Sequence, residues 1–220
     1  MWKSEDNEKN AAASWSFLDV YFVLDLIEKV LIGYFFVGIV MRVLPQMQDN
    51  RAIIDCLLIV SEGAAAFLIL TRRPTKNASL RLFDWTVTAI GTIFPLLAAP
   101  SATQPLAPLA FCGTVMALGF VLQISAKLTL RRSFGLVPAN RGVKIGGPYK
   151  FIRHPMYAGY LMTHIGFFLT HPSLWNFAIY AAALSAQCFR LLAEERLLKQ
   201  DPAYEAFMNT TRYRLVPFVF

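Results

Sequence analysis

Two short stretches in the C-terminal half gather the side chains that could do chemistry. Residues 146–160 read GGPYKFIRHPMYAGY, and residues 187–196 read QCFRLLAEER. Because proline suits the first turn of a helix, Pro155 predicts a helix start with His154 and Arg153 at its mouth. The spare backbone N–H groups of a helix start, together with an arginine, favour a carboxylate or a phosphate as ligand.

The second stretch is expected to form the charged end of a helix. Gln187, Arg190 and Glu194 are spaced i, i+3 and i+7, so they share one helical face. Glu195 points about 100° away from that face. The stretch therefore offers two adjacent carboxylates that face different surroundings.

Apolar residues on either side of THPS, residues 170–173, predict a helical hairpin. Tyr157 follows His154 by three residues and lies on the same helical face. A hairpin would bring the charged ends of its two helices to one membrane surface. The residues expected to meet there are Arg153, His154, Tyr157, Arg190, Glu194 and Glu195.

The chemistry of this set suits S-adenosylmethionine. Arginine or a helix start suits the carboxylate of that cofactor, and acidic side chains suit its ammonium group and ribose hydroxyls. Aromatic faces suit its sulfonium. The same inventory would also serve a phospholipid headgroup or a nucleotide, so the residues alone do not select the ligand.

The spacing of these residues resembles the isoprenylcysteine carboxyl methyltransferase and phospholipid methyltransferase superfamily. The pattern G-P-Y-x-x-x-R-H-P-x-Y-x-G is followed by an apolar stretch and a Glu pair. The matching positions are Gly147, Pro148, Tyr149, Arg153, His154, Pro155, Tyr157, Gly159, Glu194 and Glu195. The resemblance covers roughly residues 127–220, and the closing TRYRLVPFVF is similar to the tail of bacterial members.

The resemblance implies methyl transfer from S-adenosylmethionine to a lipophilic acceptor that enters from the bilayer. It implies a multi-pass protein of a bacterial inner membrane, with the active site facing the cytoplasm and no metal. The cofactor-binding residues expected are Gly147, Tyr149, His154, Tyr157, Arg190, Glu194 and Glu195. The expected catalytic residues are Arg153, as the group that orients an acceptor carboxylate, and Glu195.

Each of these residues also has a structural interpretation. His154 could cap a helix, Tyr157 could anchor the chain at the membrane interface, and the Glu pair could be a solvated helix end. For Arg190, an ion pair to Glu194 at i+4 is an alternative to cofactor binding. The joint pattern within about fifty residues favours the functional interpretation.

Composition predicts an integral membrane protein. Of 220 residues, 56% are hydrophobic and 16% are charged, whereas soluble domains carry about 25% charged residues. Apolar blocks long enough to cross a bilayer as helices predict five or six membrane segments. These blocks cover 21–44, 52–70, 84–100, 106–127, 155–170 and 173–193.

Basic residues predict the orientation of these segments. Residues 71–82 and 127–153 are rich in Lys and Arg and contain no acid, whereas 100–108 and 170–173 contain neither Lys nor Arg. Basic residues gather in cytoplasmic loops, so both termini are expected in the cytoplasm. This topology and contact with anionic membrane lipids explain the net charge of +7, and nucleic acid is excluded as a partner.

The expected fold is therefore an all-α transmembrane bundle with three regions. A mobile polar tail covers residues 1–20, the first four membrane helices cover 21–127, and the catalytic region covers 128–220. Asp55 and Glu62 lie seven residues apart on one helical face. They could line a polar path, but an interfacial Asp55 and a paired Glu62 are the favoured interpretation.

The methyl acceptor stays open at this point. A carboxylate of isoprenylcysteine type is the leading hypothesis, an ethanolamine-type phospholipid is the alternative, and another lipophilic molecule is possible. A small transporter or a membrane scaffold is the competing class of function. It is disfavoured because the polar residues gather at one surface instead of at the midplane, where transporter sites lie.

Overall fold

The computed structural model describes residues 3–47, 51–71, 81–130, 143–217 and 219, and over 3–21 and at 24 it describes the backbone alone. Within these residues the chain forms helices and no strand. The α-helices are α1 (Lys3–Val43), α2 (Ala52–Thr71), α3 (Leu82–Ile93), α4 (Leu109–Leu130), α5 (Pro155–Thr170), α6 (Leu174–Leu198) and α7 (Pro202–Thr210). Short 3₁₀ turns are η1 (Leu44–Gln46), η3 (Phe94–Leu97) and η5 (Gly147–Lys150). The predicted all-α class is confirmed.

Each of the helices α1 to α6 overlaps one of the six apolar blocks. Two of them, α2 and α4, are long and apolar enough to cross a membrane, and Leu82–Leu97 is a shorter apolar helix. Helix α1 begins at Lys3, well before the residue 21 that the apolar pattern predicted, so the backbone of the expected tail is helical. The mobility of residues 1–20 stays a prediction.

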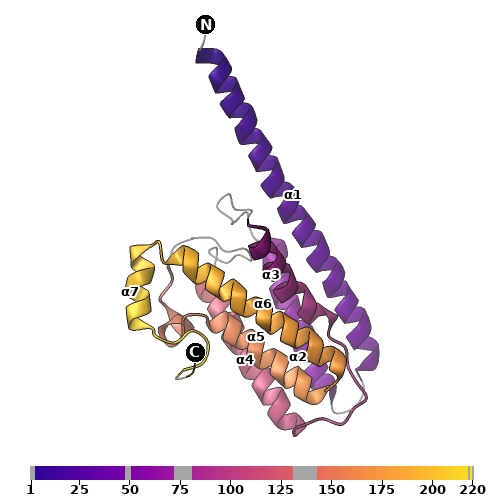
Figure 1. Ribbon diagram of the computed structural model, residues 1–220. Helices are drawn as coiled ribbons and strands as arrows, with labels where there is room; N and C mark the ends of the chain where they lie inside the picture. The colour runs from indigo at the N-terminus through magenta and orange to yellow at the C-terminus, as the bar shows by residue number, and fades with distance from the viewer. Residues whose placement is uncertain (1–2, 48–50, 72–80, 131–142, 218, 220) are drawn as a thin grey trace.

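Three connections between helices meet at one end of the bundle (Figure 1). Arg42, at the end of α1, donates from Nη1 to the Leu97 carbonyl at 2.6 Å. Arg51 donates to the Ser101 carbonyl at 2.9 Å, and the Trp175 indole donates to the Leu97 carbonyl at 3.0 Å. Helices α1 to α6 therefore run alternately up and down, as the predicted topology requires.

The described residues on either side of the two predicted basic loops lie at the opposite end of the bundle. Most of the charges of these loops, at 72–80 and 131–142, lie outside the described residues, so the orientation of the bundle stays a prediction. Lys127 was counted with the second loop but lies buried in the last turn of α4. Its ammonium donates to Gln123 Oε1 at 2.9 Å and lies 4.9 Å from the Tyr160 ring centre, which offsets the cost of burying the charge.

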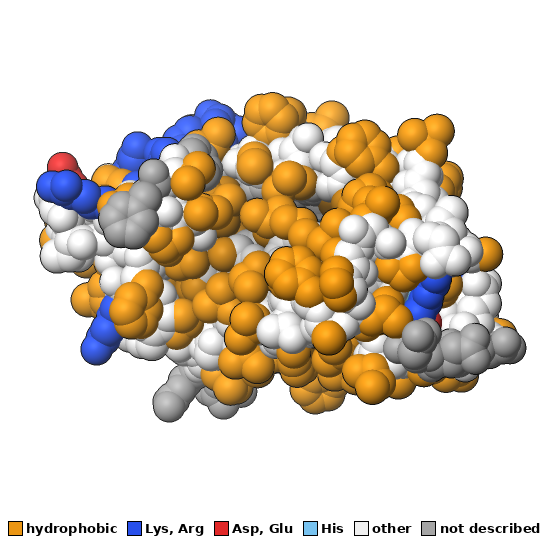
Figure 2. Space-filling model, turned by 90° about the horizontal axis from the view of Figure 1, so that it is seen from below, with side chains coloured by type: hydrophobic (Ala, Val, Ile, Leu, Met, Phe, Trp, Pro, Cys, Tyr) orange, Lys and Arg blue, Asp and Glu red, His pale blue; other side chains and the backbone are white. Residues whose placement is uncertain are grey.

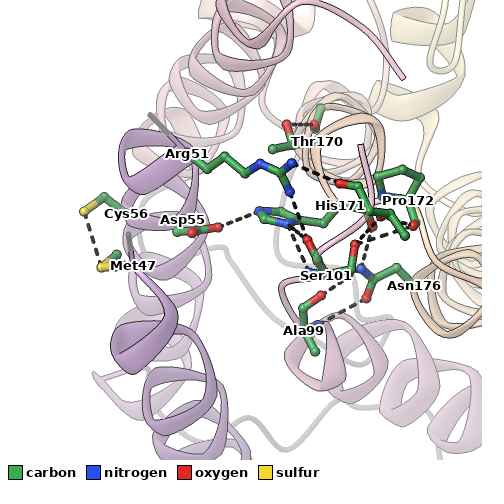
Figure 3. Close-up of polar contacts among 12 residues, drawn as sticks. Met47, Arg51, Asp55, Cys56, Ala99, Ser101, Thr170, His171, Pro172 and Asn176 are labelled. Atoms are coloured by element: carbon green, nitrogen blue, oxygen red, sulfur yellow. Dashed lines mark hydrogen bonds and ion pairs between the residues drawn. The ribbon is translucent and has the colours of Figure 1, made fainter. Parts of the chain in front are cut away.

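The two acids of α2 are buried opposite histidines, and Figure 3 shows the pair of Asp55 and His171. His171 Nε2 lies 2.9 Å from Asp55 Oδ1, and the Ser101 backbone N–H donates to His171 Nδ1 at 3.1 Å. Glu62 Oε1 lies 3.7 Å from His164 Nε2. Asp55 thus pairs with His171 and is buried, not interfacial. Glu62 lies beside His164, but neither Glu62 Oε1 nor His164 Nε2 has a hydrogen-bond partner among the described residues, so the pairing of Glu62 stays a prediction.

Large apolar side chains cover much of the outer surface. Figure 2 shows hydrophobic side chains over most of the face seen from below, with few charged side chains among them. Phe67 of α2 is 64% exposed, Val121 of α4 is 62% exposed and Phe177 of α6 is 57% exposed. An apolar exterior of this extent is suited to lipid rather than to water, in agreement with a membrane protein.

Helices α4 and α5 approach each other at glycines. A Cβ atom built on Gly159 would lie 2.6 Å from the Gly119 carbonyl oxygen, and one built on Gly119 would lie 2.7 Å from the Gly159 carbonyl oxygen. Gly159, Thr163 and Gly166 form a stripe of small residues along α5, and α4 packs against it. This contact fixes α5, whose first turn carries the site.

Gly159→Ala is expected to destabilise the protein by about 1–3 kcal/mol, because the added methyl group must push two backbones apart. Gly33→Ala is the matched control, since nothing lies within 4 Å of a Cβ at Gly33 of α1. The helix preference of alanine should leave that variant unchanged or slightly more stable. Thermal unfolding in detergent measures both variants, and equal melting temperatures would contradict the packing.

Candidate active site

The approach to α5 is fixed by a turn. Gly147 has a φ of +55°, a conformation that favours glycine, and a Cβ there would lie 2.7 Å from Thr129 Oγ1 of α4. The chain then passes through η5, in which the ring of Tyr149 is buried against residues of α4, α5 and α7. His154 follows as the N-cap residue of α5, and Pro155 occupies the first turn, as predicted.

The C-terminal tail lies alongside this helix start. The backbone N–H of Arg153 donates to the Tyr213 carbonyl at 2.8 Å, and that of His154 donates to the Arg214 carbonyl at 2.9 Å. The Arg153 guanidinium donates to the Arg212 carbonyl at 2.7 Å. Residues 212–214 thereby hold the RHP segment in place.

Glu195 is the centre of a buried ion cluster. Its Oε1 lies 2.8 Å from Arg153 Nη1 and 3.3 Å from His154 Nε2, and Arg214 Nε donates to its Oε2 at 3.0 Å. The Glu195 side chain is only 2% exposed. Burial raises the pKa of this carboxyl. The opposing effects are larger: hydrogen bonds to His154 and Arg214 and the charges of His154 and Arg153 lower the pKa to about 2. Glu195 is therefore ionised at neutral pH, and both of its oxygens are engaged.

Glu194 has a different environment, as the predicted angle between the two side chains requires. Tyr157 donates its hydroxyl to Glu194 Oε1 at 2.6 Å, and Arg190 Nε lies 3.7 Å from the same oxygen. The Arg190 guanidinium carbon lies 5.5 Å from the Tyr157 ring centre, in cation–π contact. The Glu194 side chain is 20% exposed, so this carboxylate remains reachable by a ligand.

Two neutral tyrosines support the cluster from the side of α7. Burial raises the pKa values of the Tyr149 and Tyr204 phenols well above their ordinary range. Both rings belong to a hydrophobic cluster that includes Met156 and Phe207. This cluster fastens α7 to the start of α5, so the short helix is part of the support of the site.

The structure brings together the six residues that the hairpin predicted to meet: Arg153, His154, Tyr157, Arg190, Glu194 and Glu195. Gly147 and Tyr149 lie beside them as the supporting turn. Arg153 was expected to be free for an acceptor because it has no acidic neighbour in the sequence. Its partner Glu195 lies 42 residues later.

Sequence reasoning missed Arg214 as a member of the cluster. The sequence feature that could have indicated Arg214 is the basic tail TRYR, which only the family resemblance had linked to the site. Its contact with Glu195 spans 19 residues and depends on the turn made by α7. Helical periodicity does not extend over such a turn, so the pairing could not be derived from spacing.

The depressed pKa of Glu195 predicts a pH dependence of stability. The carboxyl has an ordinary pKa of 4.5 and titrates at about 2 in the folded protein. Its contribution to the free energy of unfolding is therefore fully present above pH 4.5 and is lost as the pH falls towards 2. Wild type should melt above Glu195→Gln by a clear margin at pH 5. That margin should shrink below pH 4.5, and a margin unchanged at pH 3 would contradict the assignment.

The chain shows a match to one family of known proteins. Residues 107–203 match the family described as phospholipid methyltransferase, and no match was found among curated proteins. The matched residues include α4, α5 and α6, and thus the RHP segment and the Glu pair. The region that carries the candidate site is thus that of a phospholipid methyltransferase, a family of S-adenosylmethionine-dependent membrane methyltransferases in the superfamily that also contains isoprenylcysteine carboxyl methyltransferases.

Proposed function

We propose that S-adenosylmethionine binds against Glu194, Arg190 and Tyr157, with His154 beside them. The observation that carries this assignment is the difference between the two glutamates. In the part of the chain that the structure describes, the contacts of Glu194 with Tyr157 and with Arg190 both end on Oε1, so Oε2 is the oxygen assigned to the cofactor. The oxygens of Glu195 are both engaged by cations.

The donor set fits this cofactor. A carboxylate at Glu194 suits an ammonium group or ribose hydroxyls, and a guanidinium at Arg190 suits a carboxylate. The Tyr157 ring already lies against one cation, Arg190, and an aromatic face of this kind suits a sulfonium. When bound, S-adenosylmethionine supplies an electrophilic methyl group on a positively charged sulfur.

The residues of the chain then contribute positioning and exclusion of water. Arg190 and Tyr157 are buried, and groups held in a dry site need little reorganisation during the reaction. Arg153 and Glu195, the predicted catalytic pair, are proposed to be positioning residues. They fix His154 and tie residues 212–214 to the start of α5.

We propose that the acceptor is a lipid amine of ethanolamine type. Two observations favour it over the isoprenylcysteine carboxylate that the sequence first suggested. The Arg153 guanidinium, which would orient an acceptor carboxylate, is paired with Glu195 at 2.8 Å. The family match is to phospholipid methyltransferases.

An amine acceptor needs its lone pair, so its ammonium form must first lose a proton. Because Glu194 Oε2 is assigned to the cofactor, the imidazole of His154, which lies against the Tyr157 ring, is the proposed group that receives this proton. The bound cofactor would supply its methyl group to the freed nitrogen, and Glu194, Arg190 and Tyr157 would hold it in place.

Methyl transfer to defined acceptors tests the proposed function. Purified protein with methyl-labelled S-adenosylmethionine is expected to label phosphatidylethanolamine at a rate at least about tenfold above that for N-acetyl-S-farnesylcysteine, a difference that corresponds to about 1.4 kcal/mol. The reverse preference would restore the carboxylate acceptor and with it the role of Arg153 as its ligand.

We further propose that all of α1 to α6 enter the membrane and that the end with the Glu pair faces the cytoplasm. The alternating connections and the predicted basic loops support this orientation. Labelling of a cysteine at Lys144, which is exposed at that end, tests it in intact cells. If this cysteine reacts with a membrane-impermeant reagent added outside the cells, the orientation is the reverse of the one proposed.

A further inference from the structure

We propose that a cleft between α1 and α3 holds the hydrocarbon chain and ester group of the lipid whose headgroup is methylated. This inference rests on the proposed function and adds the binding site of the substrate chain. Helices α1 and α3 lie outside residues 107–203, so the family match assigns them no role. Figure 1 shows the two helices side by side.

The cleft has a volume of about 130 Å³ and an apolar wall. Its sides are formed by Ile27, Leu31 and Ile32 of α1 and by Trp85, Ala89 and Ile93 of α3. Ile27 and Leu31 are 49% and 41% exposed, so the cleft opens on the outer surface, where a lipid can enter sideways. An apolar cleft open to the bilayer suits an alkyl chain.

Two hydroxyl groups in the cleft point to a lipid with ester groups. Thr88 and Thr92 also line it, and in the described part of the chain their buried Oγ1 atoms have no hydrogen-bond partner. Thr88 is only 3% exposed. A buried hydroxyl without a partner is costly, and the ester carbonyl of a glycerophospholipid would accept a hydrogen bond from it.

Helix α3, which forms one side of the cleft, packs on α6, the helix that carries Arg190 and Glu194. Gln187 donates to the Gly91 carbonyl at 3.4 Å, and a Cβ at Gly91 would lie 3.4 Å from Gln187 Cγ. Glu28 lines the cleft and is close enough for its charge to act on Arg190, the ion-pair partner of Glu194. A chain held between α1 and α3 therefore places its headgroup towards Glu194, and the acid at Glu28 favours a cationic headgroup.

Photolabelling tests the cleft without reference to turnover. The probe is a phosphatidylethanolamine with a diazirine in its acyl chain, added to the full-length protein in detergent and mapped by mass spectrometry. Labels are expected on residues 27–32 and 85–93, with competition by unlabelled phosphatidylethanolamine. In Ala89→Trp, which fills the cleft, labelling should fall about fivefold or more. Ala110→Trp is the matched control on an exposed position of α4.

Thr88→Val separates the contribution of the hydroxyl from that of the volume. It keeps the size of the side chain and removes the donor, so labelling by the ester-linked probe should fall several-fold, whereas labelling by a diazirine alkane should not. Calorimetry should give wild-type affinity for S-adenosylmethionine in both cleft variants, which shows that they are folded.

The outcomes distinguish this inference from the proposed function. If labelling is unchanged in Ala89→Trp, or if unlabelled phosphatidylethanolamine does not compete with the probe, the assignment of the cleft as the lipid site is wrong, even if phosphatidylethanolamine is methylated. Labels that respond as expected, with no methyl transfer to that lipid, would support the cleft and overturn the acceptor.

Discussion

Glu194→Gln is expected to weaken the binding of S-adenosylmethionine by at least about tenfold while leaving the protein folded. The reason is the loss of charge at Oε2, the oxygen assigned to the cofactor. A hydrogen bond to a charged group contributes about 1.5–3 kcal/mol, and 1.4 kcal/mol corresponds to a factor of ten in affinity. The amide oxygen of Gln can still accept the hydrogen bond from Tyr157, so the local packing is kept.

Glu205→Gln is the control for this experiment. Glu205 is exposed in the first turn of α7, and the same loss of charge there should leave the affinity unchanged. Calorimetric titration and thermal unfolding are measured on each variant. A Glu194→Gln protein with wild-type affinity would remove Glu194 from the site and favour its interpretation as a helix-end ion pair with Arg190.

Arg153→Ala is expected to lower both stability and cofactor affinity. Removal of one partner from a buried ion pair costs about 3–5 kcal/mol when the remaining charge has no compensation. Because His154 and Arg214 still contact Glu195, the loss should be smaller, about 2 kcal/mol. The backbone bonds between Arg153 and the tail lose support at the same time, so His154 should become less well held.

The comparison with Arg212→Ala distinguishes the two roles considered for Arg153. Arg212 is exposed, and its contribution is the carbonyl that accepts from Arg153, which alanine retains. This variant should therefore resemble wild type. If Arg153 instead orients the acceptor, Arg153→Ala would keep its melting temperature and its affinity for S-adenosylmethionine and would lose turnover alone.

Much of the site could be predicted because it depends on local helical geometry. The proline after His154 placed the start of α5, and a spacing of three residues placed Tyr157 on the same face as His154. The apolar blocks at 155–170 and 173–193 gave the hairpin, which then brought Glu194 to Tyr157. Each of these steps uses periodicity within one helix or a short turn.

The separate environments of the two glutamates could be predicted only in part. The 100° between adjacent helical residues indicates that Glu194 and Glu195 face different ways. Which of them becomes the buried anchor depends on Arg153 and Arg214, which reach Glu195 from distant parts of the chain. The early start of α1 was missed for a different reason, since residues 3–20 lack the apolar pattern from which a membrane helix is recognised.

The most direct test of the cofactor site is an experimental structure of the protein with S-adenosylhomocysteine, the demethylated cofactor, bound. The ligand is expected within hydrogen-bonding distance of Glu194 Oε2 and beside Tyr157, with the ion cluster around Glu195 unchanged. A ligand bound elsewhere, for example at the opposite end near Asp55 and His171, or one that displaces Arg153 from Glu195, would contradict the account.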